Sequence, residues 1–151
     1  MPDPLPPKAA AAADFTCNVQ LYSGPLYALS CLLLGKGVRA DRAVTATFAA
    51  LYEPWLKESG RTEDFSTLAY RECIRQCSLL AQDRSSSVFA RLSWEDQITS
   101  VLWYGIQLPL PEISRILQRG VPELKAQLRG IREQMAAVHS ALPAVLRPSA
   151  G

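Results

Sequence analysis

The side chains best suited to chemistry are polar residues on a short helix predicted near the carboxyl end of the chain. Lys125, Gln127 and Arg129 fall between apolar positions of this helix, so they point outward. Amine and guanidinium groups bind phosphate oxygens, and amide groups bind base edges. The segment therefore has the groups that a DNA-reading helix needs, and it implies no bond making or breaking.

A helix-turn-helix must position these side chains. Its apolar residues repeat at helical spacing on both sides of a turn, with Ile113, Ile116 and Leu117 before it and Leu124, Leu128 and Ile131 after it. We expect Gly120 to make the turn and Pro122 to lie in the first turn of the second helix. Three short helices are predicted over Leu92–Met135. A plain helical hairpin that closes a bundle would have the same spacing.

The cysteines offer a weaker signal for chemistry. Cys73 and Cys77 lie one helical turn apart and could share a metal ion or form a redox pair. We expect instead four reduced cysteines on buried helix faces, with Cys17 and Cys31 completing the set. His139 has no partnering motif, so we expect a protein without enzymatic activity, metal or cofactor.

The remaining periodic segments predict three helices in the amino-terminal half. The first runs from about Phe15 to Leu34, with a kink or a helix start near Pro25. The second begins near Arg39 or Ala40 and ends near Pro54, and the third covers about Asp64 to Gln82. Leu21, Leu26, Leu29, Leu32 and Leu33 are expected to form the apolar face of the first helix.

Composition supports an all-α protein of two small helical domains. Hydrophobic residues make up 48% of the 151 residues, Ala and Leu are abundant, and no long alternating run predicts a strand. We predict a flexible tail over 1–13, a three-helix unit over 14–82, a linker over 83–91, a helix-turn-helix unit over 92–142 and a second tail over 143–151. Leu92 and Trp94 are the residues expected to pack the two units together if they close on each other.

Charge and hydropathy exclude several classes of protein. A net charge of +2 is too small for a general nucleic-acid binder of the histone type. No apolar run is long enough to span a bilayer, and the first residues lack the basic start and apolar core of a signal peptide. We therefore expect a cytoplasmic protein with no membrane partner and no small-molecule substrate.

Both halves together resemble one family, the extracytoplasmic-function group of bacterial RNA polymerase sigma factors. Residues 40–48, Ala-Asp-Arg-Ala-Val-Thr-Ala-Thr-Phe, are similar to the family's Ala-Glu-Asp-Ala-Val-Gln-Glu-Val-Phe helix. Residues 112–117, Glu-Ile-Ser-Arg-Ile-Leu, resemble its Glu-Ile-Ala-Glu-Ile-Leu segment. Further matches lie in residues 21–35, 68–71 and 124–133, so the resemblance covers most of residues 18–138.

The resemblance implies a sigma region 2-like unit followed by a sigma region 4-like unit, with RNA polymerase core and promoter DNA as partners. Asp41 would dock on the polymerase together with its apolar helix neighbours Val44 and Phe48. In the second unit, Gln127 and Lys125 would contact base edges. The phosphate contacts implied are Arg119, Lys125, Arg129 and Arg132.

The chain departs from the family at its contact surfaces. Arg42 and Ala46 stand where the family has acidic residues, and residues 78–82 lack the usual basic and aromatic side chains. Gln118 stands at the position where the family usually has the glycine of the turn, and we expect Gly120 to make the turn in its place. An alternative hypothesis is therefore a divergent sigma-like module that binds an anti-sigma factor or an assembly partner without melting promoters.

Overall fold

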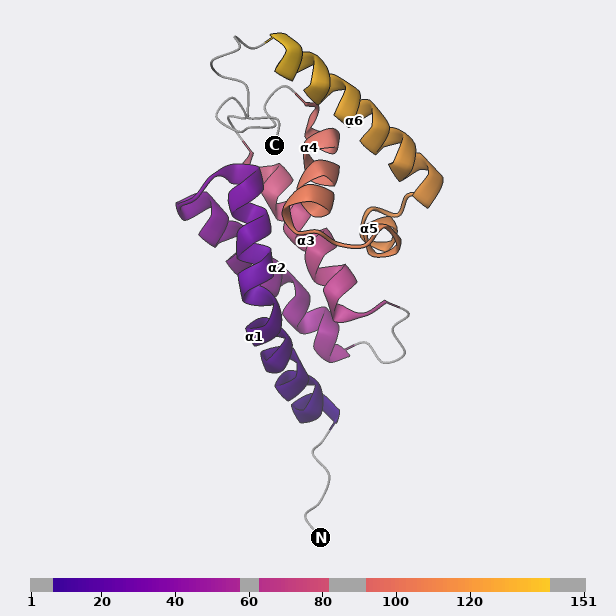
Figure 1. Ribbon diagram of the computed structural model, residues 1–151. Coiled ribbons are helices and arrows are strands. Elements are labelled where there is room, and N and C mark those ends of the chain that lie inside the picture. The colour runs from indigo at the N-terminus through magenta and orange to yellow at the C-terminus, as the bar shows by residue number, and fades with distance from the viewer. Residues whose placement is uncertain (1–6, 58–62, 82–91, 142–151) are drawn as a thin grey trace.

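The computed structural model describes residues 7–57, 63–81 and 92–141 (Figure 1). All regular structure in these ranges is helical, so the predicted all-α class is confirmed. The elements are α1 (Pro7–Leu34), α2 (Val38–Lys57), α3 (Phe65–Leu80), α4 (Trp94–Ser100), the π-helical turn η1 (Val101–Gly105), α5 (Leu110–Leu117) and α6 (Val121–Ala141). Within this part of the chain, none of the helices combines the length and apolar character needed to cross a bilayer.

Helix α1 begins well before the predicted residue Phe15. Residues 7–13 are helical, so the flexible tail predicted for residues 1–13 is wrong in this part; residues 1–6 lie outside the described ranges. Alanine has the highest helix propensity, and Pro7 suits a first helical position because it has no N–H to leave unpaired. The extension is also held at its base, where the Trp55 indole N–H donates to Asp14 at 3.1 Å.

Two prolines lie inside helices that were expected to start, kink or stop there. Pro25 lies within α1, and α2 runs past Pro54 to Lys57. A proline leaves the carbonyl four residues earlier without its helical donor. Those carbonyls belong to Leu21 and Ala50, which are both exposed residues where water can replace the lost donor. Gly35 and Gly37 follow the last residue of α1, and both have positive φ.

The amino-terminal core forms where α1, α2 and α3 pack together. Leu26 and Leu29 of α1 are fully buried, whereas Leu21 and Leu32, expected on the same apolar face, are 67% and 40% exposed. Asp64 precedes α3 and caps it, because its carboxylate accepts from the backbone N–H of Thr67 at 3.1 Å. Part of this core is aromatic, because the ring of Phe65 contacts the rings of Phe15, Tyr22, Phe48 and Trp55.

The carboxy-terminal half contains two helices joined by a short connection, which is compatible with the predicted helix-turn-helix and with a plain helical hairpin. Ser93 caps α4, which continues into η1, and α5 and α6 follow with a short connection between them. The turn differs from the prediction in one respect. Gln118, at φ 56° and ψ 45°, adopts the left-handed conformation that ends α5, whereas the φ of Gly120 is not positive. The expectation that Gly120 replaces the turn glycine is therefore wrong, because Gln118 takes that conformation itself.

The two halves share one hydrophobic core. Buried residues of α1 and α3 join Val101, Leu102, Ile113 and Leu124 of the second half in a single cluster. Trp94 contributes to this contact as expected, and its indole N–H donates to Ser78 of α3 at 2.8 Å. Leu92 instead packs with Leu128 and Ile131 in a smaller cluster inside the second half. The predicted linker, residues 83–91, and the tail over 143–151 lie outside the described residues.

We expect Gln118→Gly to stabilise the protein by about 0.5–1 kcal/mol. A left-handed conformation costs a residue with a Cβ roughly 1–2 kcal/mol, and the greater freedom of unfolded glycine offsets part of that gain. Urea unfolding measures the difference. Gly120→Ala is the matched control and should be tolerated, because its added Cβ would meet no atom closer than 3.7 Å. A loss of stability in Gln118→Gly, or a large loss in Gly120→Ala, would contradict this description of the turn.

Candidate nucleic-acid interface

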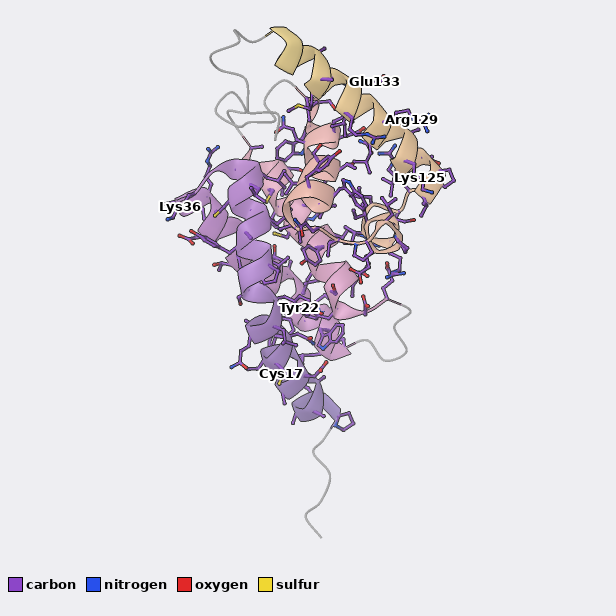
Figure 2. The ribbon with its side chains drawn as sticks, viewed as in Figure 1. Cys17, Tyr22, Lys36, Lys125, Arg129 and Glu133 are labelled. Carbon is purple, nitrogen blue, oxygen red and sulfur yellow. The ribbon has the colours of Figure 1, made fainter. Side chains whose placement is uncertain are left out.

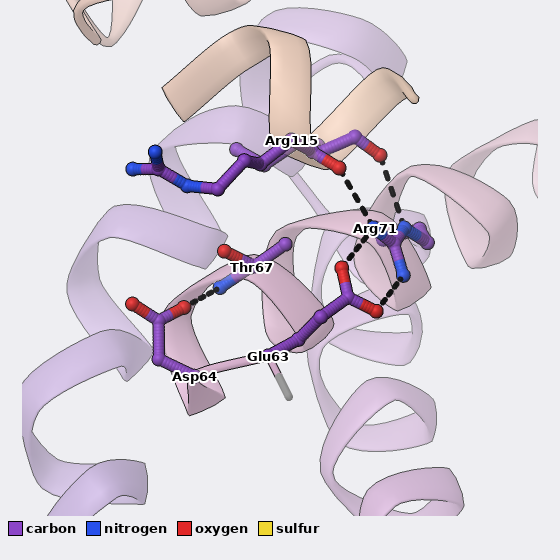
Figure 3. Close-up of polar contacts among 6 residues, drawn as sticks. Glu63, Asp64, Thr67, Arg71 and Arg115 are labelled. Carbon is purple, nitrogen blue, oxygen red and sulfur yellow. Dashed lines mark hydrogen bonds and ion pairs between the residues drawn. The ribbon is translucent and has the colours of Figure 1, made fainter. Parts of the chain in front are cut away.

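One arginine of α3 fixes the first helix of the helix-turn-helix against the amino-terminal half. Arg71 donates from Nε to the carbonyl of Ile116 at 3.1 Å and from Nη2 to the carbonyl of Arg115 at 2.7 Å (Figure 3). Both carbonyls belong to the last turn of α5, where no further helical donor follows. A side chain distant in sequence thus supplies the missing donors, and we call this contact the Arg71 bridge.

Glu63 completes the Arg71 bridge on its other side. Its two carboxylate oxygens accept from Nη1 and Nη2 of Arg71 at 2.9 and 2.5 Å, a bidentate ion pair. These hydrogen bonds lower the pKa of Glu63 and raise the pKa of Arg71. Both side chains are only partly exposed, at 35% and 28%, so solvent screens the pair less than an open surface pair. The guanidinium is consequently held in one orientation toward α5.

Helix α6 has one buried face and one basic face. Leu124, Leu128 and Ile131 are buried against the rest of the second half. Lys125, Arg129 and Arg132 are exposed and follow one another at intervals of four and three residues, which places them on one side of the helix. Figure 2 shows Lys125 and Arg129 along the outer side of α6. We call these three cations the basic row.

The cations of the basic row have no acidic partner among the described residues, a property that they share with the exposed cations Lys36 and Arg42. Among the residues that the structure describes, Lys125, Arg129 and Arg132 form no ion pair, whereas Arg75 pairs with Glu72 at 2.7 Å and Arg119 with Glu123 at 3.7 Å. Like charges one helical turn apart repel each other and destabilise a helix slightly. An anion bound along the row would remove this repulsion.

Two of the residues predicted to contact DNA, Gln127 and Arg119, form hydrogen bonds within the protein instead. The Gln127 carbonyl oxygen accepts from Thr99 at 2.9 Å and from Arg119 at 2.8 Å, and its amide nitrogen donates to Asp96 at 2.8 Å. Gln127 is half-buried, and these bonds tie α6 to α4. The structure therefore brings Lys125, Arg129 and Arg132 together on the open face, while Gln127 and Arg119 form a separate internal network.

A hollow beside the basic row contains two aromatic residues that the sequence did not indicate as contacts. It has a volume of about 260 Å³ and is lined by the three cations, by Trp103 and Tyr104 of η1, and by the apolar side chains of Leu110 and Leu128. Trp103 packs against both core clusters. Val101 and Leu102 are buried, and Tyr104 lies two residues after Leu102, outside the apolar stripe. An aromatic residue at such a position was the signal by which the sequence could have indicated this site.

The predicted polymerase-docking residues divide into one exposed and two packed side chains. Asp41 is exposed and lines a mostly apolar hollow of about 590 Å³ between α2 and α3. Val44 and Phe48 are half-buried and pack against the main core. The hollow is otherwise lined by Val38, Arg42, Thr45, Ala46, Gln76, Leu79 and Leu80.

The four cysteines differ in their burial. Cys73 and Cys77 are buried, and each lies near the Ser30 hydroxyl, at 3.2 and 3.6 Å respectively. Their mutual hydrogen bond lowers the pKa of Cys73 to about 7 and raises the pKa of Cys77. Cys17 is exposed, so the expectation that all four cysteines lie on buried faces is wrong. The side chain of His139 lies outside the described residues.

No protein-family model and no curated protein matches this chain. The functional evidence is therefore the geometry of α6, with its open basic row, the aromatic hollow next to that row and the Arg71 bridge that holds α5.

We expect Arg71→Met to destabilise the protein by about 1–3 kcal/mol, the range for hydrogen bonds that involve a charged group. The substitution leaves the Arg115 and Ile116 carbonyls without this donor and removes the partner of Glu63. Arg75→Met, one turn away on α3, is the matched control, because solvent screens its pair with Glu72, in which the arginine side chain is 59% exposed. Equal losses for the two variants in urea unfolding would contradict the role of the Arg71 bridge.

The lowered pKa of Glu63 also predicts a pH dependence. Unfolded Glu titrates near about 4.3, and the folded pKa lies below that value, so the stabilisation is complete above this pH and is lost as the pH falls through the folded pKa. In Glu63→Gln, stability should fall less steeply below about pH 4.3 than in the native protein. Identical pH profiles from thermal unfolding would show that Arg71 does not hold the carboxylate in its charged form.

Proposed function

We propose that this chain is a sigma-factor-like protein of transcription initiation, which contacts promoter DNA through α6 and RNA polymerase core through α2 and α3. The single observation that carries the proposal is the basic row, three exposed cations without acidic partners on the second helix of a helix-turn-helix. In this motif the second helix is the one that enters the major groove. The packing of the two halves leaves these three cations exposed.

The dimensions of the basic row suit a duplex. From Lys125 to Arg132 the helix rises about 10 Å, and the major groove is about 12 Å wide. The three cations can therefore reach phosphates along one groove wall while the exposed first turn of α6 faces the bases. Glu123 and Ala126 are exposed in or near that turn. A carboxylate can accept from cytosine, and a methyl group can contact thymine.

Gln127 has a different role in this proposal from the one that the sequence suggested. Contact with a base edge would break its bonds to Thr99, Arg119 and Asp96. We infer that Gln127 fixes the orientation of α6 on α4. The phosphate contacts then supply affinity, and sequence preference comes from the other exposed residues of the first turns.

The hollow beside Asp41 supports the polymerase contact. An apolar hollow of about 590 Å³ whose wall carries one carboxylate, Asp41, and one guanidinium, Arg42, suits a protein surface that presents apolar side chains with charges of both signs at the rim. Val44 and Phe48 then act by holding α2 in place from the core side.

A second candidate function is a sigma-like interaction module that binds a regulatory protein, such as an anti-sigma factor. The internal bonds of Gln127 favour this candidate, because they remove from the open face the amide best suited to read bases. In that case the hollow of α2 and α3 is the partner's site, and duplex binding is weak at all salt concentrations.

The basic row can be tested by the salt dependence of duplex binding. Lys125→Ala together with Arg129→Ala should weaken binding to all duplex sequences by a similar factor and lower the slope of log K against log salt by about 2, or about 1 for each phosphate contact. Fluorescence anisotropy with labelled genomic fragments measures both quantities. Lys57→Ala on α2 is the control, because that residue is an exposed cation with an acidic partner. Equal slopes for the native and double-variant proteins would exclude the row as the DNA contact.

A further inference from the structure

The hollow beside the basic row has a chemical character that duplex binding does not use. Its cations face Trp103 and Tyr104, and Leu110 and Leu128 supply an apolar lining. Tyr104 is 45% exposed, although Leu102, two residues earlier, is fully buried. Phosphates on the outside of a duplex contact cations and polar groups, so they need neither an exposed aromatic ring nor an apolar wall.

The backbone of η1 is what turns these two aromatic residues toward α6. The N–H of Ile106 donates to the carbonyl of Val101 at 2.8 Å, a spacing of five residues instead of the four of an α-helix. Gly105 presses against α1, since a Cβ there would lie 2.7 Å from Cδ1 of Leu32. Single π-helical turns occur frequently at functional sites. This turn is held on one side by the core and presents Trp103 and Tyr104 on the other.

A second hollow lies on the other side of the aromatic pair. It has a volume of about 370 Å³, and Trp103 and Tyr104 are shared between the two hollows. Gln107 also lines it and has a left-handed backbone, at φ 65°. Its exposed amide can donate to and accept from a base edge. Trp103 and Tyr104 thus line two hollows, one that also contains the three cations and one that also contains the Gln107 amide.

We propose that the aromatic hollow binds a nucleotide whose base is unpaired. The base stacks on Tyr104 and Trp103, and its phosphate lies against Lys125, Arg129 and Arg132. This combination of stacking rings and a cationic track is how proteins hold single-stranded nucleic acid without a strict sequence preference. The volume of about 260 Å³ lies below the range of about 300–1,000 Å³ for ligand pockets, so the hollow suits a single base, with the phosphate on the exposed cations at its edge.

The proposal goes beyond the proposed function, because it requires an aromatic pair and an unpaired base that duplex binding does not involve. The nucleotide can come from a single strand or from free solution, since both offer the same base and phosphate. An inorganic anion or an acidic peptide would use the cations alone. Stacking is therefore the property that the test has to isolate.

The test uses the full chain and two labelled ligands, a fluorescein-labelled eight-nucleotide oligo-dA strand and the same strand in duplex form. Adenosine monophosphate and inorganic phosphate are then compared as competitors for binding of the single strand. Tyr104→Ala should weaken binding of the single strand about tenfold, the order expected for loss of one stacked base. Tyr104→Phe should restore it, because phenylalanine keeps the ring. Duplex affinity should be the same in all three proteins. Quenching of tryptophan emission by adenosine monophosphate should be reduced in Trp103→Phe.

The outcomes are separable from those of the proposed function. Single-strand binding that depends on Tyr104, without duplex binding, supports the aromatic hollow and rejects the DNA-reading role of α6. Duplex binding with a single-strand affinity that Tyr104→Ala leaves unchanged overturns the aromatic hollow alone. Competition by inorganic phosphate as strong as that by adenosine monophosphate also overturns it. If adenosine monophosphate competes at concentrations similar to those at which the oligonucleotide binds, the ligand of the hollow is a free nucleotide. If only the oligonucleotide binds, the ligand is a nucleotide of a single strand.

Discussion

The fold depends on how the last carbonyl groups of α5 obtain hydrogen-bond donors. A helix of eight residues leaves its last carbonyls without donors, and here a guanidinium from α3 provides them. Because Glu63 holds the same guanidinium from the opposite side, the Arg71 bridge fixes α5 in both position and orientation. The turn after α5 then sets the direction of α6. The helix that carries the basic row is thus placed by a contact that originates in the amino-terminal half.

The buried face of α6 anchors the helix, and its exposed face presents the basic row. Leu124, Leu128 and Ile131 join the helix to the core, and Gln127 ties it to α4 through hydrogen bonds with Thr99 and Asp96. On the open face, like charges remain side by side at a small cost in helix stability. Such a cost is common at binding surfaces, where a ligand removes it. The rigidity of one face is what allows the other to present its cations in a fixed row.

Sequence periodicity was sufficient for α2, α3 and the helix-turn-helix, because each has a regular apolar stripe. It failed for the start of α1, where an alanine run reads equally as low complexity or as strong helix. It could not assign the left-handed conformation to Gln118, since local preference favours the nearby glycine. Nor could it find the bonds of Gln127 to Asp96 and Thr99, which join residues about thirty positions apart. The hollow at Tyr104 depends on a π-helical turn that has no sequence pattern.

We propose that α6 contacts DNA during transcription initiation. The most direct measurement is transcript initiation from genomic fragments by bacterial core RNA polymerase supplied with this protein, compared with the Lys125→Ala, Arg129→Ala double variant. The account predicts that the native protein binds the core enzyme and directs initiation, and that the double variant binds the core enzyme equally well but initiates less. Failure of the native protein to bind the core enzyme at low salt would contradict the account and favour a regulatory protein as the partner.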